Sequence, residues 1–107
     1  NLVVGHLKID LSKFQVNNGN KKLNLSPIEY KLLLFFVSNS NTVLSRTQIA
    51  SAVWGNTTGA TLRIIDTHIS NLRKKIELEP KNPQMLTTIR GFGYLFKNKG
   101  TQKSQVN

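Results

Sequence analysis

Short stretches of alternating polar and apolar residues fill the first 25 positions of the chain. The alternation is clearest at residues 7–11 and 22–25, and a period of two residues is typical of strands that bury one face. Residues 17–20, Asn-Asn-Gly-Asn, tolerate the positive φ angles of a hairpin turn. The chain is therefore predicted to open with a small antiparallel sheet.

Two helices are predicted from signals that cap their first amide groups. Residues 26–29 supply a serine at the cap, a proline at the first helical position and a glutamate three residues after the cap. Apolar residues at helical spacing continue this helix to about residue 38. Residues 45–48 repeat the capping pattern and predict a second helix that ends near Gly55.

The longest helix is predicted from about residue 61 to residue 77, before prolines at positions 80 and 83. Its apolar residues form one narrow stripe that must face the core, namely Ile65, Ile69, Leu72 and Ile76. The other side carries hydrogen-bonding side chains over several turns, namely Arg63, Thr67, Ser70, Asn71 and Lys74, with Asp66, His68, Arg73 and Lys75 on its flanks.

A hairpin, or wing, is predicted at about residues 86–97. Two β-prone runs, 85–89 and 94–96, enclose the Arg-Gly-Phe-Gly turn at 90–93. With 107 residues and 38% apolar composition, the chain fits one domain. We expect this domain to span residues 1–98 and the polar residues 99–107 to form a flexible tail.

The charge of the chain favours a polyanion as its partner. Fifteen Lys and Arg residues stand against five Asp and Glu residues, which gives a net charge of +10. Residues 60–107 hold nine bases and three acids, and thus six of the ten net charges. A solubilising surface is the alternative for charge of this kind, and the position of the charges argues against it.

The polar face of the third helix suits the major groove of duplex DNA. That groove admits one α-helix, and short hydrogen-bonding side chains with Arg or Lys forks distinguish its base edges. Such a face on a lone helix is more often merely solvated. Here, however, a short helix, a turn and a long basic-faced helix follow the helix-turn-helix layout. Arg90, in the hairpin turn, suits the minor groove or serves as a solubilising charge.

Other chemistries find little support in the sequence. The chain has no cysteine and two histidines, which argues against disulfides, redox chemistry and a structural zinc site. Asp66 and Ser70 lie away from His68 on one helix, so a hydrolytic relay is not expected.

Trp54 is predicted in the core, with a phosphate contact as the alternative. Phe92 and Tyr94 are considered for base stacking, which usually needs more exposed aromatics. We expect no enzyme activity, cofactor or small-molecule ligand.

Over about residues 5–97, the chain resembles the winged helix-turn-helix effector domain of OmpR/PhoB-type response regulators. The motifs that carry the resemblance are LSPIEYKLL at 25–33, LSR at 44–46 with VWG at 53–55, RIIDTHI at 63–69 with LRKK at 72–75, and TIRGFGY at 88–94. The resemblance implies an α+β fold with an N-terminal antiparallel four-stranded sheet, three helices and a C-terminal β-hairpin wing. The third helix of this fold reads DNA.

The resemblance also implies roles for individual residues. The phosphate contacts are Arg63, His68 and Arg73. The residues towards base edges are Asp66, Thr67 and Asn71; Arg90 reaches the minor groove, and Ser70 and Lys74 complete the DNA-binding set. The carboxylate of Asp66 has a second reading, in which it only holds neighbouring Arg side chains. Ser70 and Asn71 stand at positions where family members often carry Arg, and Ile64 stands where Thr is frequent. The resemblance therefore does not define the DNA sequence that this chain recognises.

Partners follow from the same resemblance. The loop that matches the segment touching RNA polymerase comprises Gly55, Asn56, Thr57, Thr58, Gly59 and Ala60. Such domains usually follow a phosphorylatable receiver domain in a bacterial two-component phosphorelay and bind direct repeats as head-to-tail dimers. The first residue is Asn rather than Met, so we expect a piece of a longer, cytoplasmic protein. The competing readings are a winged-helix module for protein contact and a binder of RNA or single strands.

Overall fold

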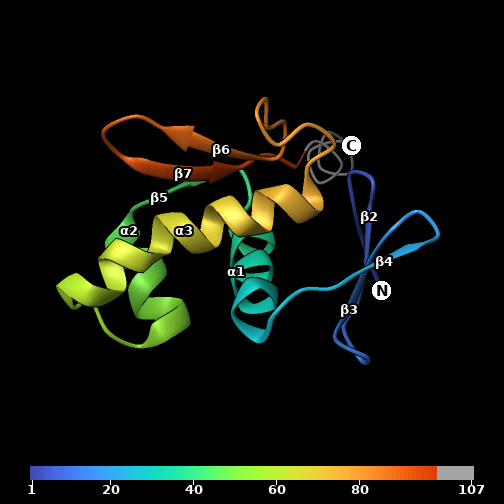
Figure 1. Ribbon diagram of the computed structural model, residues 1–107, viewed down its shortest axis with the longest axis horizontal. Helices are drawn as coiled ribbons and strands as arrows, with labels where there is room; N and C mark the ends of the chain where they lie inside the picture. Colours follow the sequence, from blue (N-terminus) through green and yellow to red (C-terminus); the bar gives the residue numbers. More distant parts are fainter. Residues whose placement is uncertain (99–107) are drawn as a thin grey trace, which may run out of the picture.

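Two antiparallel sheets pack on a group of helices in the computed structural model, which describes residues 1–98. In Figure 1 the N-terminal sheet lies at the right, the helices fill the centre and left, and the C-terminal hairpin runs along the top above α3. The expected α+β architecture is confirmed, and the expected tail at 99–107 lies outside the described residues. The elements are β1 Leu2–Val4, β2 Leu7–Asp10, β3 Gln15–Asn18, β4 Lys21–Leu23, α1 Pro27–Ser38, β5 Val43–Leu44, α2 Arg46–Ile49, η1 Ala50–Trp54, α3 Gly59–Ile76, β6 Leu86–Ile89 and β7 Gly93–Phe96.

The N-terminal sheet has the strand order β1-β2-β3-β4, and each neighbouring pair is antiparallel. The turn between β3 and β4 is shorter than predicted, because Asn17 and Asn18 pair with β4. Gly19, at φ 63°, and Asn20 remain to make the turn. The alternating pattern confirms the predicted strands, since it buries Val4, Leu7, Ile9 and Val16.

Helix α1 begins at the predicted capping box. The Ser26 hydroxyl accepts a hydrogen bond from the Glu29 amide at 3.2 Å, and the Glu29 carboxylate accepts one from the Ser26 amide at 2.8 Å. Lys75 of α3 donates to the same carboxylate oxygen at 2.6 Å. Burial raises the pKa of Glu29, but the Lys75 ammonium and the Ser26 amide outweigh burial and hold this pKa below its usual 4.5. Glu29 thereby ties α1 to α3.

The second helical segment, α2 with η1, also starts at its predicted box. The Ser45 hydroxyl accepts from the Gln48 amide at 3.1 Å, and the Gln48 side chain accepts from the Ser45 amide at 2.8 Å. The segment ends as predicted at Gly55, where φ is 78°. Its second half is a π-helix, in which the Gly55 amide donates to the Ala50 carbonyl five residues earlier. The sequence pattern predicted only an α-helix here.

Helix α3 starts two residues before its predicted start and ends one residue before its predicted end. The Thr58 hydroxyl accepts a hydrogen bond from the Thr61 amide at 3.2 Å, so the helix is capped earlier. Gly59 and Ala60 consequently lie in the first turn of α3. The predicted loop of residues 55–60 is therefore wrong in extent, and only residues 55–58 separate η1 from α3.

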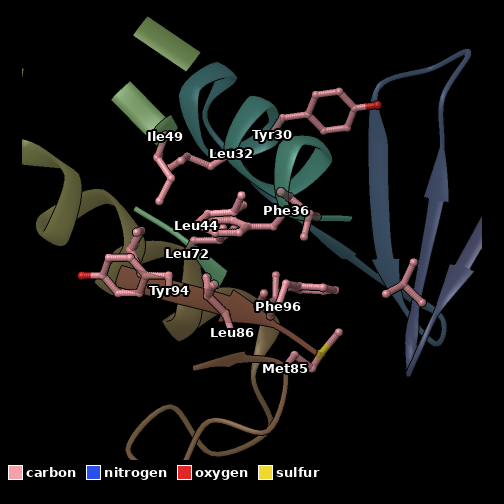
Figure 2. Close-up of a cluster of buried hydrophobic side chains, with 14 of the residues drawn as sticks. Tyr30, Leu32, Phe36, Leu44, Ile49, Leu72, Met85, Leu86, Tyr94 and Phe96 are labelled. Carbon is pink, nitrogen blue, oxygen red and sulfur yellow. The ribbon is translucent and has the colours of Figure 1, made fainter. Parts of the chain in front are cut away.

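Side chains of α1, α3 and the hairpin meet in one apolar core (Figure 2). The rings of Phe36 and Phe96 stack within it, with centroids 6.5 Å apart. The predicted stripe of α3 is confirmed, because four residues are fully buried, namely Ile65, Ile69, Leu72 and Ile76. Burial of this stripe determines which face of α3 points outward.

The predicted hairpin consists of β6 and β7, and β5 joins it in the order β5-β7-β6. The hairpin packs closely on the segment that precedes α2. A Cβ atom at Gly93, whose φ is 144°, would lie 2.0 Å from the Leu44 carbonyl oxygen. Strand β7 can approach β5 this closely because its first residue is glycine.

Glu77, buried directly after α3, holds the loop that leads to β6. Its carboxylate accepts from the Gln84 amide at 2.9 Å, from the Met85 amide at 3.1 Å and from the Leu86 amide at 2.7 Å. The predicted helix breaker Pro80 lies in this loop. Glu77 thus sets where the hairpin begins relative to the end of α3.

Candidate nucleic-acid interface

The outward face of α3 carries the polar side chains that its sequence predicted. Arg63, Thr67, Ser70 and Lys74 are exposed, and Asn71 is half-buried. The buried stripe on the opposite side anchors the helix along its length. The face is therefore held in a fixed orientation, with donors and acceptors over several turns.

Asp66, on the flank of this face, joins three elements. Its Oδ2 accepts a hydrogen bond from the Arg46 guanidinium of α2 at 2.8 Å, and its Oδ1 accepts one from the Tyr94 hydroxyl of β7 at 2.5 Å. Figure 2 shows the Tyr94 ring at the edge of the core with its hydroxyl pointing away from it. Burial and the Asp66 carboxylate raise the pKa of Tyr94 to about 12, so the hydroxyl is a donor at neutral pH.

Arg73 reaches from α3 to the hairpin. Its Nε donates to the Leu86 carbonyl at 2.7 Å, and a terminal nitrogen donates to the Thr88 hydroxyl at 2.7 Å. The guanidinium carbon also lies 5.5 Å from the centroid of the Tyr94 ring, within cation–π range. Arg73 therefore braces the hairpin, a contact that the sequence did not reveal, and its phosphate contact stays a prediction.

His68 lies on the other flank of α3 and is half-buried against Trp54, with ring centroids 5.5 Å apart. Trp54 is itself half-buried and packs on the core, in agreement with its predicted place. Because Trp54 directly precedes the loop of residues 55–58, this ring contact connects α3 with that loop.

The hairpin turn places a second basic group beside α3. Arg90, Gly91 and Phe92 are exposed there. A hollow of about 370 Å³ lies between the turn and α3, and its lining includes Arg46, Asp66 and Arg90. Arg46 is paired with Asp66, so Arg90 supplies the net positive charge of this lining, which favours an anionic occupant.

The loop of residues 55–58 is exposed and organised by one side chain. The side-chain oxygen Oδ1 of Asn56 accepts hydrogen bonds from the Thr58 amide at 3.2 Å and from the Thr61 hydroxyl at 2.5 Å. The loop is thereby fixed to the first turn of α3 and presents Thr57 to solvent.

Arg46 and Tyr94 join the candidate interface, although no role was predicted for Arg46 and only base stacking was considered for Tyr94. They lie 20 and 28 residues from Asp66 in the chain. No local spacing signal covers such distances, because the contacts depend on how α2 and β7 pack against α3. The interface is therefore larger than the polar face of one helix.

The described residues also bear on the other chemistries. Among residues 1–98 no three His, Cys, Asp or Glu side chains gather as a metal site requires. Asp66 bonds to Arg46 and Tyr94, whereas His68 packs on Trp54, so Asp66 and His68 do not form a relay. None of the helices in this range has the length and apolar content to cross a membrane.

Comparison with known proteins gives consistent matches. Residues 20–96 match the family model described as "Transcriptional regulatory protein, C terminal". A probable transcriptional regulator of Cyanophora paradoxa is 43% identical over 100 residues, which cover 92% of this chain and 42% of that protein. The DNA-binding response regulator MtrA of Mycolicibacterium smegmatis is 33% identical over 93 residues, covering 87% of this chain and 41% of MtrA. The chain thus spans less than half the length of these relatives.

Solved structures resemble the fold closely. The DNA-binding domain of Klebsiella pneumoniae RstA, in complex with the RstA box, has a TM-score of 0.81 and 29% identity, over 90% of this chain and 95% of that one. The response regulator DrrB of Thermotoga maritima, described as an OmpR/PhoB homolog, has a TM-score of 0.81 and 34% identity, over 91% of this chain and 44% of DrrB.

Proposed function

Because the chain belongs to the family of C-terminal domains of transcriptional regulatory proteins, we propose that it binds duplex DNA with α3 in the major groove and the hairpin turn at the minor groove. The RstA domain that shares this fold is described in complex with its DNA box, which supports duplex DNA as the partner. The net charge of +10 supplies the attraction for a polyanion.

One observation carries this proposal: the polar face of α3 is rigidly oriented. Its four buried isoleucine and leucine residues fix the helix on the core, and Asp66 and Arg73 fix the hairpin beside it. A preorganised helix and wing can meet both grooves without a large loss of conformational entropy.

We assign roles along this surface as follows. Arg63, His68 and Arg73 contact phosphates, which position the protein without reading bases. Thr67 and Asn71 face base edges, where a carboxamide pairs with adenine N6 and N7. The remaining members of the set are Ser70 and Lys74 beside them on α3 and Arg90, which enters the minor groove.

For the longer protein, we propose an effector domain, residues 1–98, behind a receiver domain in a cytoplasmic two-component system. The relative MtrA, 33% identical over 93 residues, is described as a DNA-binding response regulator, which supports this reading. Two copies bind direct repeats head to tail, and residues 55–60, the loop with the first two residues of α3, contact RNA polymerase. The activity of the domain is regulatory binding and not catalysis.

Titration of fluorescent duplex and single-stranded oligonucleotides at several salt concentrations tests the proposal. Basic side chains that neutralise several phosphates release counterions, so we expect a log–log slope of affinity against salt on the order of −4 to −8. Duplex is expected to bind more tightly than either single strand.

The competing readings give different results. A module for protein contact binds no nucleic acid even at low salt. An RNA or single-strand binder prefers single strands, because exposed bases stack on aromatic rings. A flat salt response of duplex binding contradicts the proposed phosphate contacts.

A further inference from the structure

A side-chain network connects the hairpin to α3 at the edge of the hollow between them. Asp66 is its centre, because each of its carboxylate oxygens accepts one hydrogen bond, from Arg46 and from Tyr94. Arg73 adds a second connection about two turns further along α3, through Leu86 and Thr88. Both strands of the hairpin are thus bonded to α3 by side chains.

The occupied oxygens leave Asp66 poorly suited to read a base. A carboxylate recognises cytosine by accepting a hydrogen bond from N4, and it must point into the groove to do so. Here the Tyr94 hydroxyl, on a 7% exposed residue, and the Arg46 guanidinium hold the carboxylate towards β7 and α2. The negative charge also repels phosphates unless a cation such as Arg46 offsets it.

Resting on the proposed function, we propose that Asp66 is a positioning residue: with Arg46 and Tyr94 it locks the hairpin against α3, so that Arg90 enters the minor groove in register with the bases that α3 reads. The hairpin turn projects from β6 and β7, so a change in the tilt of these strands moves Arg90 along the DNA. The network therefore couples sequence preference at the flank of the site to α3.

The two variants Asp66→Asn and Tyr94→Phe test this coupling. Tyr94→Phe removes only the hydroxyl that donates to Asp66 and keeps the ring beside Arg73. Each variant is expected to lower duplex affinity about 3- to 10-fold, the size of one hydrogen bond's net contribution. Asp66→Asn removes the charge that pairs with Arg46 and keeps one acceptor oxygen, so the two changes weaken contacts of the same side chain. The double variant is therefore expected to lose less binding free energy than the sum of the two single losses.

Electrostatics alone predicts that Asp66→Asn raises duplex affinity instead of lowering it. Removing a negative charge next to DNA strengthens phosphate attraction. Glu79→Gln, at an exposed acid after α3, is the matched control for this effect, and we expect it to bind DNA as tightly as the parent or more tightly. Weaker binding by Asp66→Asn therefore reports a lost contact of the side chain and not the removal of its charge.

Selection of binding sites from random duplexes separates positioning from base reading. We expect both variants to lose preference at the flank that Arg90 contacts and to keep the parent preference at the inner base pairs. The proposal is overturned if Asp66→Asn changes the preference at an inner base pair while Tyr94→Phe does not. It is also overturned if Tyr94→Phe matches the parent in affinity and flank preference.

A distance measured between α3 and the hairpin turn in the absence of DNA tests whether the network holds the hairpin in place. The chain has no cysteine, so spin labels attach only at introduced sites, here Ser70→Cys on α3 and Phe92→Cys in the hairpin turn. We expect a wider distance distribution in Asp66→Asn and Tyr94→Phe than in the parent or Glu79→Gln. Identical distributions overturn the proposal, whereas a parent that binds no duplex refutes the proposed function and leaves this measurement valid.

Discussion

Replacing Glu77 with alanine tests how the start of the hairpin is fixed to the end of α3. The carboxylate accepts hydrogen bonds from the amides of Gln84, Met85 and Leu86. Gln84 is exposed, so its amide can bind water instead. Met85 and Leu86 are 7% and 0% exposed, so their amides lose an acceptor that water cannot replace.

The structure sets the size of the expected effect. A buried donor left without an acceptor costs about 1–3 kcal/mol, so two such amides cost about 2–6 kcal/mol. This loss is a large part of the roughly 5–15 kcal/mol that stabilises an ordinary domain. Glu77→Gln keeps one acceptor oxygen and turns an NH₂ group towards the backbone amides, so a smaller loss of about 1–3 kcal/mol is expected.

Urea unfolding, followed by circular dichroism and by the fluorescence of the single tryptophan, measures these free energies. Glu79→Ala is the matched control, because Glu79 is exposed two residues further along; a surface change of this kind stays within about 0.5 kcal/mol of the parent. If Glu77→Ala unfolds at the same urea concentration as Glu79→Ala, the buried amides do not depend on this carboxylate.

Three further predictions concern the core contact of the hairpin, acid stability and the minor groove. Gly93→Ala is expected to lower the free energy of unfolding by at least about 3 kcal/mol, because its Cβ would meet the Leu44 carbonyl oxygen. Gly59→Ala, which has open space around its Cβ, is the control in thermal unfolding, and equal melting temperatures of the two variants count against the Gly93 contact. The lowered pKa of Glu29 means that its contribution to stability is present above pH 4.5 and is lost as the pH falls through the folded-state pKa; unfolding free energies measured between pH 7 and pH 3 are therefore expected to fall less steeply in Glu29→Gln, and an unchanged slope contradicts this. Arg90→Ala is expected to weaken binding most on A·T-rich flanks, where the minor groove is narrow; parent-like affinity for all flank variants makes Arg90 a surface charge only.

Local signals predicted most of the fold. Both serine caps and the buried stripe of α3 follow from interactions within a few residues of the chain, so a single sequence reveals them. Two features differed from the prediction for local reasons, namely the start of α3 and the type of helix in η1. Thr58 caps α3 ahead of Gly59, a poor helix former, and η1 widens before Gly55.

The candidate site was less predictable because its polar contacts are long-range. The flank of α3 on which Asp66 lies was predicted correctly, and one of its two predicted roles was to hold a neighbouring Arg side chain. The sequence did not reveal that this Arg is Arg46 or that Tyr94 bonds to the same carboxylate. Arg73 was assigned to phosphate, while in the fold it also bonds to the hairpin. Such contacts depend on crossing angles between elements, which the packing of the whole core determines.

The most direct test of the central claim is site selection from random duplexes by the parent, Asn71→Ala and Asn71→Arg. Asn71 is half-buried on the outward face of α3, so its truncation is expected to leave folding intact and to cost about 1–3 kcal/mol at one base pair. Asn71→Arg is expected to shift that position from adenine to guanine, whose O6 and N7 accept the guanidinium fork. Arg63→Ala, the control, is expected to weaken all sequences alike, since phosphate contacts read no base. If Asn71→Arg selects the same bases as the parent at every position, α3 does not read DNA through this face.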